Sequence, residues 1–71
     1  MDISDYELMQ RFTYHAPKET QPERYEKIRE MGRLFAQYLI THTVLSREQS
    51  LAITKIEEAV MWANAGIARN E

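Results

Sequence analysis

The sequence predicts an all-α fold, an antiparallel helical hairpin preceded by an N-terminal arm that carries a short helix. Only two glycines and two prolines interrupt the 71 residues. Three capping-box patterns mark helix starts, where a hydroxyl accepts from an early backbone N–H and a later acid or amide reaches back. Apolar residues recur at helical spacing after the second and third of them. We therefore expect one helical domain over residues 1–71.

The first capping box, Ser4 to Glu7, predicts a short helix over about residues 5–11. Pro17 brings this helix to an end, because the residue before a proline is biased away from helical dihedrals. Residues 12–19 should then be extended, so that residues 1–19 form an arm with one short helix.

The second capping box, Thr20 to Glu23, predicts a helix over residues 22–41. Pro22 supports it, because a proline in the first turn loses no hydrogen bond. The apolar face of this helix comprises Tyr25, Ile28, Gly32, Phe35 and Leu39, widened by Met31, Leu34 and Tyr38. This face is broader than the stripe that one packing partner covers.

The third capping box, Ser46 to Gln49, predicts a helix over residues 47–68. Because the connection 42–45 is short, the two long helices should be antiparallel neighbours. The third helix has an apolar stripe of Ile53, Ile56, Val60, Ala63 and Ile67, bordered by the small residues Ala52, Ala59 and Gly66. Two helices cannot cover all of these surfaces, so we expect hairpins to associate, with Phe35 and Trp62 as anchors.

Length and composition restrict both the compartment and the partners. A chain of 71 residues buries little surface alone, and without cysteine it has no disulfide to compensate, which leaves oligomerisation. The lack of cysteine fits a reducing compartment, and no apolar run approaches the ~20 residues of a membrane span, so we expect a cytoplasmic protein without a membrane partner. A net charge of −2 argues against DNA binding but permits a small anionic ligand.

Enzymatic chemistry is poorly supported. His15 and His42 lie in different connections, and neither has a second ligand at metal-binding spacing. Glu57 and Glu58 are adjacent on a helix and so point about 100° apart, which makes them a solvent-exposed face and not a catalytic dyad. The sequence predicts no catalytic residue, no metal and no cofactor.

The basic residues Arg29 and Arg33 lie one turn apart on the second predicted helix and permit two interpretations. They can form surface ion pairs with Glu26 and Glu30, three residues before each, which contribute little to stability. Alternatively the two guanidinium groups form a clamp for a phosphate or carboxylate, whose geometry suits the arginine fork.

The arm adds three ring side chains, Phe12, Tyr14 and His15. These rings can simply pack the arm over the helices. However, Tyr14 and His15 combine ring faces with hydrogen-bonding groups, which is how proteins recognise nucleotide bases. An aromatic arm beside a basic helix border therefore favours a nucleotide pocket.

Three segments carry a resemblance to a known family. They are F-x-Y-H-x-P (Phe12 to Pro17), Q-x-x-R-Y-E-x-I-R (Gln21 to Arg29) and E-E-A-V-M-W-A-N-A-G-I-A-R (Glu57 to Arg69). Together they resemble the small phage proteins that act as cyclic-oligonucleotide sponges against CBASS, the cyclic-oligonucleotide-based antiphage signalling system of bacteria.

The resemblance implies an oligomer, typically a hexamer, that binds cyclic dinucleotides such as cyclic GMP–AMP between protomers and releases them intact. Some members also hold cyclic trinucleotides at separate sites. By resemblance, Tyr14 and Arg29 contact the phosphates, with Lys27 as the competing cation, and Arg69 matches the arginine of the trinucleotide sites.

We further expect Phe12 and His15 to wall the base pocket and Arg33, with Lys27, to add positive potential. The alternative is an oligomeric helical interaction module that binds a host protein and no small ligand.

Overall fold

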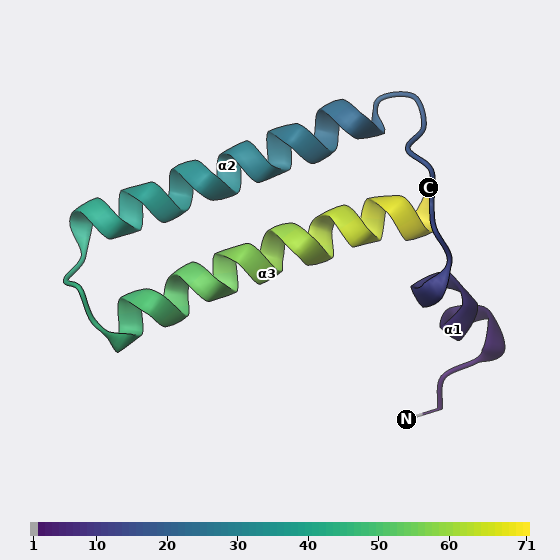
Figure 1. The fold of residues 1–71 in the computed structure, drawn as a ribbon, viewed down its shortest axis with the longest axis horizontal. Coiled ribbons are helices and arrows are strands. Elements are labelled where there is room, and N and C mark those ends of the chain that lie inside the picture. The colour runs from purple at the N-terminus through teal and green to yellow at the C-terminus, as the bar shows by residue number, and fades with distance from the viewer. Residues whose placement is uncertain (1) are drawn as a thin grey trace.

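The computed structural model describes residues 2–71, which form three helices and no strand: α1 (Asp5–Phe12), α2 (Gln21–His42) and α3 (Arg47–Asn70). α2 and α3 lie side by side and antiparallel, while α1 lies beside the C-terminal end of α3 (Figure 1). The all-α prediction is confirmed for these residues, and each helix end lies within two residues of its predicted position. The prediction that Phe12 begins the extended loop is wrong, because Phe12 is the last residue of α1.

At two of the three predicted capping boxes the hydroxyl caps the helix, although the reciprocal contact from Glu7 or Gln49 does not form. The hydroxyl of Ser4 accepts from the backbone N–H of Glu7 at 3.1 Å, and that of Ser46 accepts from Gln49 at 3.1 Å. Each hydroxyl satisfies one backbone donor that the first turn of a helix leaves free. These caps set the starts of α1 and α3.

The predicted cap at Thr20 is wrong, because Thr20 makes no side-chain hydrogen bond at the start of α2. Gln21 replaces it: the backbone N–H of Lys18 donates to the Gln21 side-chain oxygen at 3.0 Å, and the Gln21 N–H donates back to the Lys18 carbonyl at 2.8 Å. With 4% exposure, Gln21 is also the one buried residue among residues 2–71. A buried amide held in a turn thus organises the entry into α2.

The crossing of α2 and α3 depends on Gly32. A Cβ atom added at Gly32 would lie 2.5 Å from Cγ2 of Val60, so the missing side chain permits the close approach of the two helices. Gly66 differs, since nothing lies within 4 Å of the position where its Cβ would be. The small-residue border at Gly66 is therefore open in the single chain.

The chain is one helix layer thick, with dimensions of 44 × 33 × 12 Å. No hydrophobic residue among residues 2–71 is buried, and Phe35 and Trp62 are 55% and 66% exposed. Phe35 was expected in the buried stripe of α2, but it stays exposed at the edge of an apolar groove between α2 and α3, whereas Ala36 is half-buried. The chain exposes 6087 Å², whereas a compact monomer of 8.4 kDa exposes about 4,600 Å².

The arm is attached to the end of α3 by polar contacts. The amide of Gln10 donates to the backbone oxygen of Arg69 at 3.4 Å, and the amine of Lys18 donates to the backbone oxygen of Glu71 at 3.1 Å. Arg24 of α2 forms a two-point ion pair with the Glu71 carboxylate. These contacts join the arm and both long helices at one end of the hairpin. No helix within residues 2–71 is long and apolar enough to cross a membrane.

Candidate ligand-binding groove

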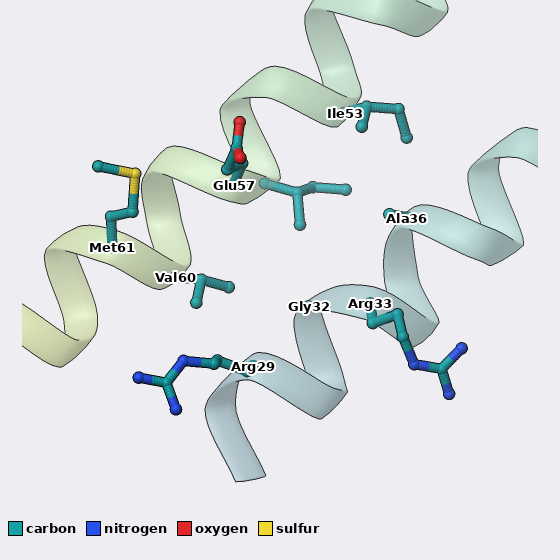
Figure 2. A pocket seen from close by; sticks show the side chains of 9 residues that line it. Arg29, Gly32, Arg33, Ala36, Ile53, Glu57, Val60 and Met61 are labelled. Atoms are coloured by element: carbon teal, nitrogen blue, oxygen red, sulfur yellow. The ribbon is translucent and has the colours of Figure 1, made fainter. Parts of the chain in front are cut away.

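A groove of about 360 Å³ lies between α2 and α3 near the middle of the hairpin (Figure 2). α2 contributes Arg29, Gly32, Arg33 and Ala36, and α3 contributes Ile53, Ile56, Glu57, Val60 and Met61. The volume is within the range of small-molecule sites, roughly 300 to 1,000 Å³. Its lining is apolar apart from two arginines and one glutamate, the arrangement of a site that holds a flat ring and orients it with few polar groups.

Helical periodicity explains why these residues share a groove. Arg29, Gly32, Arg33 and Ala36 have spacings of three and four, so their side chains leave α2 on one side. Gly32 and Ala36 leave room beside α3, and the long arginine side chains extend beyond them. The two arginines, predicted to lie one turn apart on this helix, both line the groove.

Arg33 is already paired with acidic and amide groups of its own helix. Its guanidinium donates to Glu30 at 2.8 and 3.1 Å and to Gln37 at 3.4 Å. The hydrogen bond from Arg33 lowers the pKa of the Glu30 carboxyl, and the same bond raises the pKa of Arg33. The predicted Glu30–Arg33 surface pair is confirmed.

Arg29 is different. Its side chain makes no hydrogen bond or ion pair with any of residues 2–71, so the predicted surface pair with Glu26 is not formed. Figure 2 shows the guanidinium groups of Arg29 and Arg33 pointing in opposite directions. The two-arginine clamp is thus not assembled in the single chain, and Arg29 supplies the available cation at this groove.

Glu57 is exposed, as the sequence predicts, and it also lines the groove from α3, on the wall opposite Arg29 (Figure 2). Glu58 points elsewhere and pairs with Lys55 at 3.4 Å. The spacing of Glu57 from Ile53 and Val60, four and three residues, was the signal that could have shown it shares their side of α3.

The aromatic arm does not contribute to this groove within one chain. Phe12 and Tyr14 are 84% and 82% exposed, and neither lines the groove. Lys27 is also exposed and does not line the groove. A pocket that combines these side chains with Arg29 would need a second protomer.

His15 and Arg69 instead line a second concavity of about 320 Å³ between the arm and the end of α3. His15 is half-buried, and its Nε2 lies 3.1 Å from the backbone oxygen of Gln10. Lys18 and Tyr6 border the same concavity. The structure thus separates the seven predicted site residues into Arg29 with Arg33, His15 with Arg69, and the outward-facing Phe12, Tyr14 and Lys27.

No group of three or more His, Cys, Asp or Glu side chains within residues 2–71 is placed to hold a metal ion. His42, which was expected in the connection, is the last residue of α2. Its ring stacks on Tyr38 with centroids 3.9 Å apart, and its Nδ1 lies 2.9 Å from the Tyr38 backbone oxygen. His42 therefore packs against the last turn of α2.

Comparison with known proteins gives one clear result. No curated protein and no solved structure gives a significant match to the chain. The family model described as the Acb2/Tad1 hairpin domain matches residues 5–68, which include most of all three helices and both walls of the groove. Members of this family are binding sponges and not enzymes. The chain belongs to the Acb2/Tad1 hairpin family, the phage anti-CBASS proteins that sequester cyclic oligonucleotides.

Proposed function

We propose that this protein binds cyclic dinucleotides such as cyclic GMP–AMP and sequesters them intact in the cytoplasm of the infected bacterium. Effectors of CBASS then lack the messenger that activates them. The observation that carries this proposal is Arg29, a guanidinium without a partner among residues 2–71, at the edge of an apolar groove large enough for a base.

The chemistry of the groove suits binding. A guanidinium donates two parallel hydrogen bonds to a phosphate, and such charge-assisted bonds are about twice as strong as neutral ones. Apolar side chains of Ile53, Ile56 and Val60 offer a dry surface for a base. A sponge without turnover must compete with a receptor, so we expect nanomolar affinity, on the order of −12 kcal/mol.

We infer that the binding unit is an oligomer, with a hexamer as the expected state. The exposed surface exceeds that of a compact monomer by roughly 1,500 Å² per chain, an area typical of obligate interfaces. An apolar groove of about 610 Å³, lined by Met31, Phe35 and Ala59 among others, also lies on the hairpin and is suited to a neighbouring helix.

In this assembly, Tyr14 of one protomer completes the site at Arg29 of another. The Tyr14 ring is 82% exposed in its own chain, so it is available to a second copy. A cyclic dinucleotide has two-fold symmetry, and a two-fold interface presents each contributing side chain twice. Phe12 and Lys27, which are also exposed, border the same shared pocket in this proposal.

The concavity at His15 and Arg69 favours a second ligand class, cyclic trinucleotides. Its lining combines the cations Lys18 and Arg69 with the aromatic ring of Tyr6. It is separate from the groove at Arg29, so the two ligand classes need not compete.

The test is isothermal titration with cyclic GMP–AMP, with the oligomer mass measured on the same sample. We expect saturable nanomolar binding at one ligand per two chains, and a rise in melting temperature on adding ligand, as linkage requires. Absence of heat and of thermal stabilisation with cyclic GMP–AMP, cyclic di-GMP, cyclic di-AMP and cyclic triadenylate would refute the proposal. The exposed apolar faces would then favour the alternative, a module that binds a host protein.

A further inference from the structure

Glu57 is a carboxylate in a groove that the proposed function assigns to a ligand carrying two phosphates. It lines the groove from α3 and forms no ion pair with any of residues 2–71, including Arg29 on the opposite wall (Figure 2). Its charge repels a phosphate placed beside it. A carboxylate at this position therefore weakens ligand binding unless it accepts hydrogen bonds from another part of the ligand.

The bases of the ligand offer such donors unequally. The Watson–Crick edge of guanine presents two adjacent donors, N1–H and the N2 amino group, and an ionised carboxylate has two acceptor oxygens at matching spacing. Adenine presents an amino donor beside N1, which is an acceptor. A carboxylate that approaches the adenine edge thus gains one hydrogen bond and places its second oxygen against a lone pair.

The positions in the groove agree with this division of roles. Arg29 lines the groove from α2, and Glu57 lines it from α3 together with the apolar side chains of Ile56 and Val60. A base lying on these side chains can direct its edge to Glu57 while the phosphate remains near Arg29. Arg33 does not neutralise Glu57, because its guanidinium is held by Glu30 at 2.8 Å.

We propose that Glu57 determines base specificity and selects cyclic dinucleotides that contain guanine over those with adenine alone. This inference rests on the proposed function, since it concerns the base half of the same site.

The experiment compares cyclic di-GMP and cyclic di-AMP by titration of the oligomeric protein and of Glu57→Gln. The wild type should bind cyclic di-GMP about tenfold or more tightly than cyclic di-AMP, the scale of one charge-assisted hydrogen bond. Glu57→Gln should weaken cyclic di-GMP binding about tenfold and leave cyclic di-AMP binding unchanged or tighter, because the repulsion of phosphate is lost. Glu57→Asp, which keeps the two acceptor oxygens, should retain a preference for guanine.

Glu58→Gln is the matched control, because Glu58 is the adjacent carboxylate outside the groove, and it should change neither affinity. Equal affinity of the wild type for both ligands, or an equal change for both in Glu57→Gln, would overturn the role of Glu57 while leaving the sponge function intact. Absence of binding to either ligand, and to cyclic GMP–AMP, would instead refute the proposed function itself.

Discussion

Arg29 and Arg33 show how neighbouring residues of one type can differ in availability. Both lie on the groove side of α2, but Arg33 donates to Glu30 and Gln37, whereas Arg29 makes no contact of this kind with residues 2–71. A ligand phosphate gains the full benefit of a guanidinium only if no other carboxylate must be displaced. Arg29 is therefore the stronger candidate for phosphate binding.

At the residue scale, we predict that Arg29→Ala raises the dissociation constant for cyclic GMP–AMP by about 10 to 100-fold, the cost of one charged hydrogen bond. Arg33→Ala should have a clearly smaller effect, because its guanidinium is already paired. Titration calorimetry of both variants, with the oligomer mass checked, measures the difference. Equal losses would mean that Arg33 leaves Glu30 on binding and that the two-arginine clamp forms after all.

A second residue-scale prediction concerns Tyr14. Because its ring is 82% exposed, Tyr14→Ala should leave the melting temperature of the free protein nearly unchanged. The same variant should weaken cyclic GMP–AMP binding by about tenfold, since stacking or a hydrogen bond of the ring contributes about 1 to 3 kcal/mol. Affinity within twofold of the wild type would remove Tyr14 from the site.

At the element scale, α2 and α3 can approach closely because Gly32 has no side chain. Gly32→Ala would place Cβ 2.5 Å from Cγ2 of Val60, and a β-branched side chain has little freedom to move away. We predict a loss of about 1 to 3 kcal/mol in the free energy of unfolding, measured by urea denaturation, as overpacked sites usually show.

Gly66→Ala is the comparison within the same hairpin, because nothing lies within 4 Å of its added Cβ. Within the single chain this change should be neutral or stabilising by about 1 kcal/mol, since alanine has a higher helix propensity than glycine. If Gly66→Ala instead lowers the oligomer mass, the border at Gly66 is in contact with another protomer.

The ion pair of Arg24 with Glu71 at the end of the hairpin should make the stability of the protein depend on pH. The hydrogen bond from Arg24 lowers the pKa of Glu71 below its ordinary value of 4.5. A lowered folded-state pKa means that the stabilisation is present above pH 4.5 and is lost as the pH falls through the lower, folded-state value.

We therefore predict that wild type and Arg24→Gln differ in melting temperature by a constant amount near neutral pH, and that this difference shrinks as the pH falls below 4.5. Both side chains are 43% exposed, so added salt should also reduce the difference. A difference that persists unchanged in acid would assign the contribution of Arg24 to packing and not to its ion pair.

At the scale of the whole molecule, folding and association should be coupled. No hydrophobic residue among residues 2–71 is buried in the single chain, and the chain is 12 Å thick, so both faces are open. We predict that the melting temperature rises with protein concentration, as mass action requires for an oligomer without a stable monomer.

Introducing a charged residue on one face of the hairpin tests whether that face contacts another protomer. Phe35→Glu should lower the oligomer mass and the melting temperature, because Phe35 is 55% exposed beside the apolar groove of α2 and α3. Leu45→Glu is the matched control, since Leu45 is 88% exposed in the connection after α2 and should tolerate the charge. Unchanged mass in Phe35→Glu would direct the search to the face that carries Trp62.

Much of the fold could be predicted from the sequence because its signals are local. Ser4 and Ser46 cap helices through the backbone of the next few residues, and helix spacing sets which residues share a side. Thr20 fails as a cap because the adjacent Gln21 enters a buried turn, and burial is not visible in a capping pattern. For the site, periodicity alone placed Arg29 and Arg33 together.

The sequence by itself determined the helices, the antiparallel hairpin and the excess of apolar surface. These follow from the capping residues, the short connection between the long helices, and the number and spacing of the apolar side chains. Only the tertiary structure decided which charged residues face each other across the groove. The pair of Arg33 with Glu30 is local to α2, but the position of Glu57 across from Arg29 depends on how α2 and α3 are rotated against each other at Gly32. That rotation is set by packing between residues far apart in the chain, which a local pattern does not contain.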